Sequence, residues 1–409
     1  MTDDGRRGLD RLARAWLARL DVELPAAREL RRRLHAEPRL SGQEQDTTDL
    51  VLTELGVAGT PVAGTGAWVR VGPPGSSIGV RAELDALPVV ERTSVGWAAS
   101  GVAMHACGHD VHLAALVAVL RAAAALPTGL LPQGVVGVFQ PREESDASGG
   151  LDVVSSGLLA DQGVRAMVGA HVHHGVPAGS VSTGAGAINA AYDGFEVTVT
   201  GRGGHGAYPE SARDPITALA RIALGLPGLV RTTVPGMRPA VISVGTLRAG
   251  DGAANVIPDT GLLLASLRTY DATDRERLRA RVAEFVTATA QAAGCVGTTR
   301  VMPGEPVLSN DPVLSRGTDR WLGALGLRAV EPIRTLGSDD FAYYAERVPA
   351  LMCFVGVHDE PGLGVPSLHD PEFLPPDRAV GDVARAMIAA WLGAADMLAG
   401  EDDHVHLRQ

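Results

Sequence analysis

The chain is poor in cysteine. Its 409 residues include three cysteines, Cys107, Cys295 and Cys353, which lie far apart in the sequence. An odd and widely spaced set does not form the disulfide framework of a small secreted protein, so we expect a reducing, cytoplasmic location. Cys107 lies between two histidines and therefore needs a chemical explanation of its own.

Positive charge is also scarce, because 36 Lys and Arg face 47 Asp and Glu, for a formal net charge of -11. Phosphate backbones and anionic lipids do not attract an acidic protein, which disfavours a nucleic-acid or membrane-surface binder. The start of the chain has no apolar signal-peptide core, and the apolar run 113–120 ends at Arg121, far short of a bilayer span. We expect a small-molecule partner, with no nucleic acid and no membrane.

The alternation of apolar runs predicts the fold class. Strand-like runs at 78–82, 135–139 and 166–172 alternate with a helical run at 110–125. This alternation predicts an α/β sheet flanked by helices, in which ligands bind at the carboxyl ends of the strands. The first 56 residues are predicted to be mainly helical, and we interpret the basic cluster 31–33 as a solvated helix face.

The pattern changes near residue 189, and the length of the chain favours two domains. We predict an inserted α+β domain over 189–299, between two parts of a catalytic domain, 1–188 and 300–409. The elements expected in the insertion, a βαββα-like block, are a strand at 195–199, a helix after 215, strands at 240–247 and 262–268, and a helix at about 275–293.

Metal-binding side chains are concentrated in MHACGHDVH, residues 104–112. Cys107 and His109 have the Cys-x-His spacing that lets two side chains of one turn face a common metal. Alone, such a pair is more often a packed cysteine and a surface histidine than a metal site.

Other candidate ligands follow apolar runs. Glu143 and Glu144 come directly after one run and His171 ends another, each where a strand-end loop would present it. A metal would offset the repulsion between the adjacent glutamates, although two solvated surface glutamates would be equally stable. His369, far away in the sequence, is by itself typical of a surface loop.

Seven motifs together cover nearly the whole chain and occur in a familiar order. They are HACGHDVH, FQPREE, GAHVH, GRGGHGAYP, ANVIP, LGSDDF and LHDPEF. In this order they resemble the di-metal amidohydrolases that include hippurate hydrolase, N-acyl-amino-acid amidohydrolases and indole-acetyl-amino-acid hydrolases. The resemblance implies a mixed-sheet di-metal catalytic domain flanked by helices, and an inserted lid and dimerisation domain that forms a homodimer.

Carried over residue by residue, the resemblance implies two divalent cations per subunit. Their ligands would be Cys107 as a bridging thiolate, His109, Glu144, His171 and His369. Glu143 would be the general base and later the general acid, a role typically worth about 10² to 10⁴ in rate. Thiolate and imidazole suit zinc, and two-metal sites with carboxylates also accept manganese, cobalt or nickel.

The same resemblance assigns roles to five further residues. Asp85 matches an aspartate beside the metal ligands and Asp110 could orient a ligand histidine, although both could equally be helix caps or turn formers. His205 matches a histidine that stabilises the oxyanion in a neighbouring subunit's site. Asn255 and Arg268 match contacts for the substrate's carbonyl and carboxylate, although Arg268 alone would be interpreted as a surface residue.

The implied reaction is hydrolysis of an N-acyl amino acid, hippurate-like or related, by metal-activated water. A metal-dependent dipeptidase or carboxypeptidase is the nearest alternative. A catalytically silent metal-binding protein is disfavoured because Glu143 and all five ligands are retained. Departures from the family pattern at Glu83, at Ser145–Asp146 and at His173–His174 affect the shape of the pocket and hence the substrate.

Two other motifs lack the context that their enzyme classes require. GRGGHG, residues 201–206, satisfies the dinucleotide pattern, but Tyr208 and Pro209 follow where a helix should begin. GSSIG, residues 75–79, would make Ser77 a serine-hydrolase nucleophile, but a strand follows where a helix is needed. We interpret both as turns.

Overall fold

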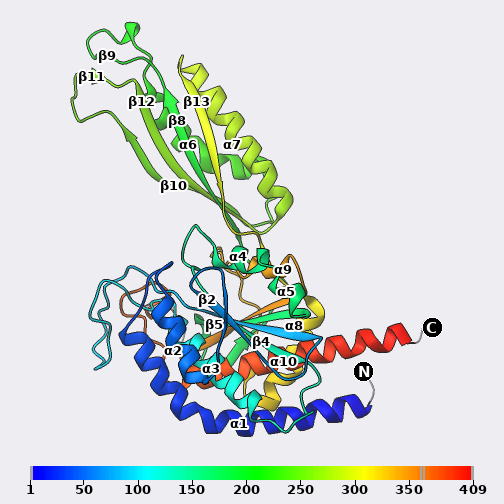
Figure 1. Ribbon diagram of the computed structural model, residues 1–409. Helices are drawn as coiled ribbons and strands as arrows, with labels where there is room; N and C mark the ends of the chain where they lie inside the picture. The colour runs from blue at the N-terminus through cyan, green and yellow to red at the C-terminus, as the bar shows by residue number, and fades with distance from the viewer. Residues whose placement is uncertain (1–2, 360–361, 363, 407–409) are drawn as a thin grey trace. The chain divides into compact units, whose positions relative to one another are not determined.

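The computed structural model describes residues 3–359, 362 and 364–406 (Figure 1). The chain forms two compact units. The first unit comprises Met1–Gly186, Ser309–Ile333 and Asp340–Gln409, and the second comprises Ala187–Leu308 and Arg334–Asp339.

The first unit is built on an eight-stranded mixed sheet with the order β1-β2-β4-β3-β5-β16-β6-β15. Its strands are β1 (Thr60–Val62), β2 (Gly66–Val71), β3 (Ser77–Glu83), β4 (Gly134–Gln140), β5 (Val164–Pro177), β6 (Ser180–Ser182), β15 (Arg328–Ala329) and β16 (Ala350–His358). The central strands β4, β3, β5 and β16 are parallel, so their carboxyl ends meet at one edge. β3 and β4 are buried throughout, as expected for parallel strands that are covered on both faces.

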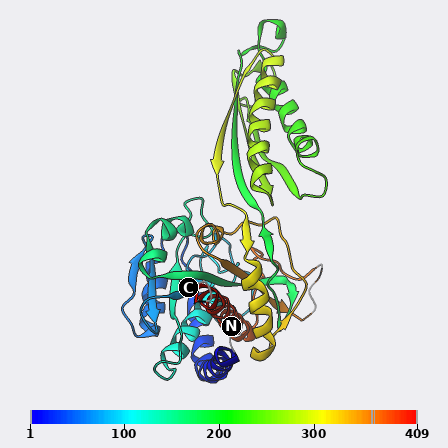
Figure 2. The same cartoon turned by 90° about the vertical axis from the view of Figure 1, so that its right-hand side faces the viewer.

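Helices cover both faces of this sheet, as Figure 2 shows. On one face lie α1 (Asp3–Ala36), α3 (His109–Ala124) and α10 (Arg378–His406), and on the other lie α4 (Gly149–Ser155), α5 (Leu158–Asp161) and α9 (Ala342–Ala345). The remaining helices are α2 (Gln45–Leu55), α8 (Pro312–Leu322) and the 3-10 turn η2 (Gly323–Leu325). The predicted α/β fold with a mixed sheet and flanking helices is confirmed.

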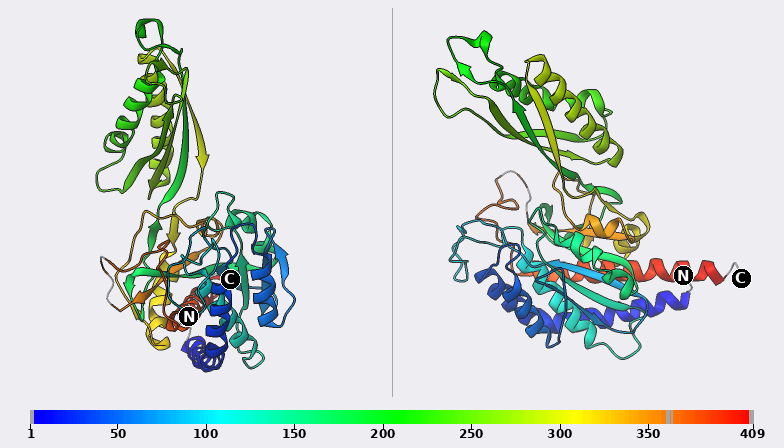
Figure 3. Two further views of the ribbon diagram at one scale, coloured as in Figure 1. Left: turned by 90° about the vertical axis from the view of Figure 1, so that its left-hand side faces the viewer. Right: turned by 45° about the horizontal axis from the view of Figure 1, so that its top comes forward.

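The apolar helix α10 lies along one face of the sheet, where it packs against β5, β16, α1 and α8 (Figure 3). The ring of Trp391 on α10 packs edge to face against that of Trp16 on α1, with 5.2 Å between the ring centroids. Within the described residues, Arg378–Gly400 is the one segment that is long and apolar enough to cross a membrane by length and composition alone. Because 78% of its apolar window is buried inside the protein, burial in the core accounts for its composition.

The second unit has a four-stranded antiparallel sheet with the order β10-β12-β8-β13, and two helices on one face of it. Its elements are β8 (Ala191–Thr200), β10 (Ala240–Ala249), β12 (Thr260–Thr269), β13 (Val296–Pro303), α6 (Pro215–Thr233) and α7 (Ala272–Ala292). Every second residue of β12 is buried, as in a sheet with one covered face. Helix α6 begins where Asp214 accepts a hydrogen bond from the Ile216 amide and Pro215 occupies the first turn.

Short elements complete the chain. A two-stranded ribbon of β9 (Gly204–His205) and β11 (Val256–Ile257) belongs to the second unit, as does the 3-10 turn η1 (Pro209–Ser211). The strands β7 (Gly186–Asn189) and β14 (Leu308–Asn310) lie where the chain passes from one unit to the other.

The basic cluster at the end of α1 differs from the expectation of a solvated face. Arg31 is fully buried and its guanidinium contacts Asp110 at 2.9 Å and Asp377 at 3.1 Å. Its neighbours Arg32 and Arg33 are 41% and 50% exposed, so the expectation is wrong for Arg31 alone. The reason is that α1 packs against α3, which places Asp110 opposite this residue.

Candidate metal centre

The carboxyl edge of the central strands carries the candidate ligands of the first unit. Glu143 and Glu144 lie in the loop after β4, and His171 lies in the middle of β5, two residues beyond Gly169, the last residue of β5 that pairs with β3. Cys107 and His109 lie at the start of α3. Because β4 and β5 are parallel to β3, their ends bring these separate segments to one edge of the sheet.

The structure brings the five candidate ligands together. Cys107, Glu144 and His369 each offer a ligand atom within 4.8 Å of the others, and His109 joins Glu144 in an overlapping group. The Sγ atom of Cys107 lies 3.5 Å from Nε2 of His171. Nε2 of His369 lies 3.3 Å from Oε1 of Glu144. This set of thiol, imidazole and carboxylate groups matches the chemistry that divalent transition metals prefer.

Backbone carbonyls orient two of the histidine rings. Nδ1 of His109 lies 2.8 Å from the Asp85 carbonyl oxygen, and Nδ1 of His171 lies 2.7 Å from the Val172 carbonyl oxygen. A carbonyl oxygen only accepts, so Nδ1 carries a proton in each ring, and Nε2 is the nitrogen whose lone pair the neutral ring presents. Nε2 of His109 is buried and makes no hydrogen bond. An orphaned buried lone pair of this kind fits a cation at the centre of the cluster.

The electrostatics around Cys107 also fit a cation. Burial, together with the carboxylates of Glu144, Glu143 and Glu83, raises the pKa of the Cys107 thiol well above its ordinary value. Burial holds the pKa of His171 well below its usual range, which keeps this ring neutral. A thiolate in such surroundings needs a positive charge beside it, and a bound metal ion supplies that charge.

Asp85 supports two of the candidate ligands. Its Oδ2 accepts hydrogen bonds from the backbone N–H of Glu144, at 2.9 Å, and from the Ser41 hydroxyl, at 2.6 Å. Its carbonyl oxygen is the group that orients His109. Burial raises the pKa of Asp85, against the opposing effects of His109 and Ser41. The structure therefore places Asp85 behind the candidate ligands Glu144 and His109.

Asp110 does not orient a ligand histidine, and that expectation is wrong. Its Oδ2 contacts Nε of Arg31 at 2.9 Å and Nδ1 of His35 at 3.0 Å, both on α1. Asp110 follows His109 directly on α3, and successive helical residues point about 100° apart, so the two side chains face different neighbours.

The backbone adopts unusual conformations beside the site. His369 and Arg142, which precedes Glu143, have φ angles of 68° and 55°, in the left-handed region. The N–H of His369 donates to the Ala106 carbonyl oxygen at 2.9 Å, which ties its loop to the start of α3. Gly108 has a φ of 82°, and a Cβ atom there would lie 2.4 Å from Cγ2 of Val172. Only glycine fits between Cys107 and His109.

The structure adds two residues to the cluster that the sequence did not single out as site residues. His112 and Glu83 join His109 and His171 in a buried group whose ligand atoms all lie within 4.8 Å of one another. Burial opposes ionisation of Glu83, but the charge of Arg81 and the hydrogen bond from His112 outweigh it and hold its pKa well below the usual range. The spacing of His109 and His112 on one helix face was the available signal.

His205, Asn255 and Arg268 lie in the second unit. His205 pairs with Val256 in the ribbon, and the N–H of the next residue donates to the Asn255 carbonyl oxygen at 2.7 Å, so His205 and Asn255 are neighbours. Arg268 lies near the opposite end of β12, where it donates to the Leu336 carbonyl oxygen at 2.8 Å. Thr260, at the ribbon end of β12, is eight residue steps away from it, about 27 Å at a rise of about 3.4 Å per residue.

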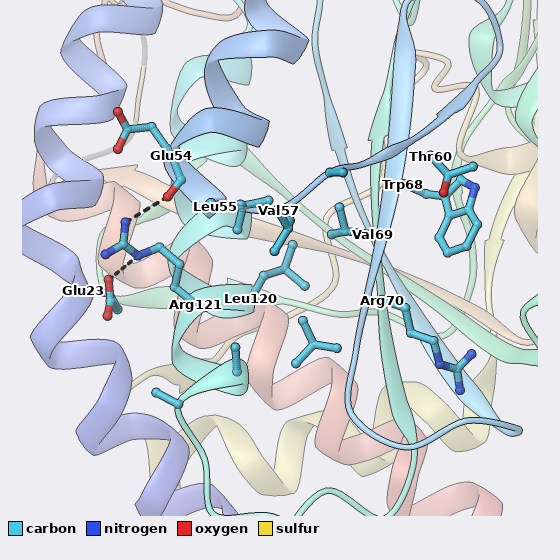
Figure 4. Close-up of a pocket in the computed structure, with 15 residues that line it drawn as sticks. Glu23, Glu54, Leu55, Val57, Thr60, Trp68, Val69, Arg70, Leu120 and Arg121 are labelled. Carbon is cyan, nitrogen blue, oxygen red and sulfur yellow. Dashed lines mark hydrogen bonds and ion pairs between the residues drawn. The ribbon is translucent and has the colours of Figure 1, made fainter.

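A separate cavity of about 620 Å³ lies among α1, α2, α3 and β2 (Figure 4). None of the candidate ligands lines it. Arg121 there pairs with Glu23 at 2.6 Å and donates to the Glu54 carbonyl oxygen at 3.0 Å. Since this charge is already matched, the metal-binding groups at the strand ends remain the candidate functional site.

Comparison with known proteins agrees with this geometry. The N-acetyl-L-cysteine deacetylase of Bacillus subtilis (strain 168) is 33% identical over 337 residues, which cover 80% of this chain and 79% of that protein. Thermostable carboxypeptidase 2 of Saccharolobus solfataricus is 31% identical over 346 residues, which cover 81% and 86%. A Bacillus subtilis structure described as a dinuclear metal binding peptidase of the M20 family superposes with a TM-score of 0.77 at 27% identity, over 92% of this chain and 99% of that one.

The sequence profile of peptidase family M20/M25/M40 matches residues 79–392, which include all the strand-end segments of the site. The resemblance inferred from the order of the seven motifs is confirmed. The chain therefore belongs to peptidase family M20/M25/M40, and it is a hydrolase of amide bonds.

Proposed function

We propose that the protein hydrolyses the amide bond of an N-acyl amino acid, a hippurate-like or related conjugate, and releases a carboxylic acid and a free amino acid. The observation that carries this proposal is the convergence of the five candidate ligands at one sheet edge, with Glu143 beside them. The likeness to an N-acetyl-L-cysteine deacetylase supports an acylated amino acid as the substrate class.

The ligands proposed for two divalent cations, zinc or manganese in the first place, are Cys107 as the bridge, His109, Glu144, His171 and His369. When bound, the two cations would polarise the scissile carbonyl and lower the pKa of the attacking water. The chain's own contribution is to hold Nδ1 of two histidines on backbone carbonyls, which leaves Nε2 of each for a cation, and to exclude bulk water from the thiol.

Glu143 is proposed as the group that moves the proton. Its Oε2 lies 3.8 Å from Nε2 of His109, and its side chain is 10% exposed. Since the neighbouring Glu144 is assigned to a metal, Glu143 can take a proton from water and then pass it to the leaving amine. Asp85, behind both, keeps the glutamate segment in register through the Glu144 amide.

In the second unit, Arg268 is proposed to bind the substrate carboxylate, and His205 with Asn255 to bind the carbonyl oxygen as negative charge develops on it. An N-acyl amino acid is far shorter than the roughly 27 Å of strand between Arg268 and the ribbon. One copy of this unit therefore cannot present all three groups to one substrate, which supports a homodimer in which His205 and Asn255 serve the partner's site. The edge strand β10, which pairs only with β12 in the described part of the chain, offers a free backbone edge to a second copy.

A carboxypeptidase or dipeptidase activity is the second candidate. The likeness to thermostable carboxypeptidase 2 favours it, because both reactions hydrolyse an amide beside a free carboxylate. The two activities differ in the group that they accept at the amino-terminal side of the substrate. Substrates with an acyl group, a blocked amino terminus and a free amino terminus distinguish them.

Metal removal tests the metal centre. Dialysis against a strong chelator should abolish hydrolysis of N-acyl amino acids, because the carbonyl loses its polarising cations. Addition of zinc or manganese should restore the activity, with about two ions per chain by elemental analysis. Full activity in protein shown to be free of metal would contradict the proposal.

Glu143→Gln tests the proton-moving role. We expect kcat to fall by about 10² to 10⁴, since the amide cannot take a proton, with the metal content unchanged. Glu29→Gln is the matched control, because it makes the same change at a glutamate of α1 that is 66% exposed and has no part in the site, so it should leave kcat unchanged. Equal kcat values for the two variants would remove Glu143 from the mechanism.

Mixing two inactive variants tests the shared site. His205→Ala and Glu143→Gln should each be nearly inactive, but mixed dimers contain one site with both groups intact. A 1:1 mixture after subunit exchange should recover about one quarter of the wild-type activity. No recovery, once mixed dimers have been detected by mass spectrometry, would place His205 in its own subunit's site.

A substrate panel tests Arg268. Amidation of the substrate carboxyl group should raise KM about tenfold or more for the wild type, because charge-assisted hydrogen bonds are lost. The Arg268→Ala variant should have a high KM for both forms. Faster cleavage of dipeptides with a free amino terminus than of hippurate and N-acetyl amino acids would favour the dipeptidase alternative.

A further inference from the structure

His112, the third histidine of MHACGHDVH, lies in the metal centre but has no part in the proposed chemistry. It is fully buried on α3. Its ring centroid lies 4.6 Å from that of His171 and 5.6 Å from that of His109. This position allows two roles for His112, as a further metal ligand or as a support for the others.

The hydrogen bonds of the ring decide between these roles. The backbone N–H of Val172 donates to Nε2 of His112 at 2.9 Å. Since an N–H group only donates, Nε2 carries no proton and the neutral ring bears its proton on Nδ1. That Nδ1 lies 2.8 Å from Oε2 of Glu83, which accepts the proton's hydrogen bond. Both nitrogens are in use, so neither has a lone pair to offer a cation.

Glu83 is itself held in place. Arg81, two residues earlier on β3, contacts the other carboxylate oxygen of Glu83. Nη2 of Arg81 also lies 2.8 Å from Oδ1 of Asp340, and all three side chains are buried. The acceptor for the His112 proton is therefore anchored by charged groups that have no contact with solvent.

The contact with Val172 bears on His171, the preceding residue of β5. Strand β3 pairs with β5 only as far as Gly169, opposite Arg81. Beyond Gly169, in the part of the chain that the structure describes, β3 no longer pairs with β5. The Val172 N–H instead donates to the side chain of His112. The carbonyl oxygen of Val172 is also the group that orients the His171 ring.

We propose that His112 is a positioning residue whose neutral ring anchors the Val172 amide and so aims Nε2 of His171 at the metal centre. Glu83 acts through it by keeping the proton on Nδ1. The inference rests on the proposed role of His171 as a metal ligand. Loss of a contact that orients a ligand typically weakens metal affinity by about 10- to 100-fold, and we expect a loss of this order here.

Two substitutions separate the two contacts of the ring. In His112→Gln the side-chain amide reaches the position of Nε2 and can still accept from Val172. In His112→Asn it reaches only the position of Nδ1, so the contact with Glu83 is kept and the Val172 amide loses its acceptor. Zinc affinity is measured on the full chain by competition with a chromophoric chelator, with the melting temperature of the metal-free protein as a check on folding.

We expect His112→Asn to bind one of two zinc ions about 10- to 100-fold more weakly than the wild type, and His112→Gln to stay within about threefold. Equal affinities for the two variants, whether both normal or both weakened, would overturn the proposal. His171→Ala separates failure of the positioning role from failure of the ligand assignment: a variant that still binds both ions tightly would show that His171 is not a ligand.

The wild-type protein provides a readout that does not depend on the variants' folding. Nitrogen-15 NMR of the histidine rings should show Nε2 of His112 unprotonated and Nδ1 protonated, both without zinc and with it. Nε2 of His171 should shift when zinc is added. A zinc-induced shift of comparable size at Nε2 of His112 would make it a ligand and overturn the positioning role.

Discussion

The site depends on where two imidazole protons are held. Carbonyl oxygens of Asp85 and Val172 each accept from the Nδ1–H of a histidine, and this leaves Nε2 of His109 and of His171 as the nitrogen that each ring can offer to a cation. A free histidine exchanges its proton between the two nitrogens, so without these carbonyls the metal would compete with the alternative tautomer. The acceptors are backbone groups of β5 and of the segment after β3, so the sheet itself sets the ligand chemistry.

The parallel strands make this arrangement possible at one edge. Each strand ends beside its neighbours, and the loops that follow bring carboxylates and histidines from distant parts of the chain to within a few ångströms. The buried charged groups behind that edge also form ion pairs. Arg81 links Glu83 to Asp340, and Arg31 links Asp110 to Asp377, so that the burial of each charge is offset by a partner.

Much of the fold class was predictable from the sequence, because the periodicity and the length of apolar runs depend directly on which residues are buried. The alternation of strand-like and helical runs predicted the α/β sheet, and the order of the motifs predicted the family. Partners across the molecule were not predictable in the same way. The residue that faces Asp110 lies 79 positions away on α1, and the separation of Arg268 from Asn255 along β12 depends on strand register. The segment Arg334–Asp339 joins the second unit with no local signal in its sequence. Such facts come from packing between elements, which a local pattern does not encode.

His369 differs from the other proposed ligands in its exposure to solvent. Its side chain is 53% exposed, whereas that of Glu144, which it faces, is 11% exposed. Ligands at a wet rim are displaced by solvent more readily than those in a dry interior. Under the proposed ligand set, the ion next to His369 would therefore exchange with solvent faster than its neighbour, and it would be the last to bind and the first to leave.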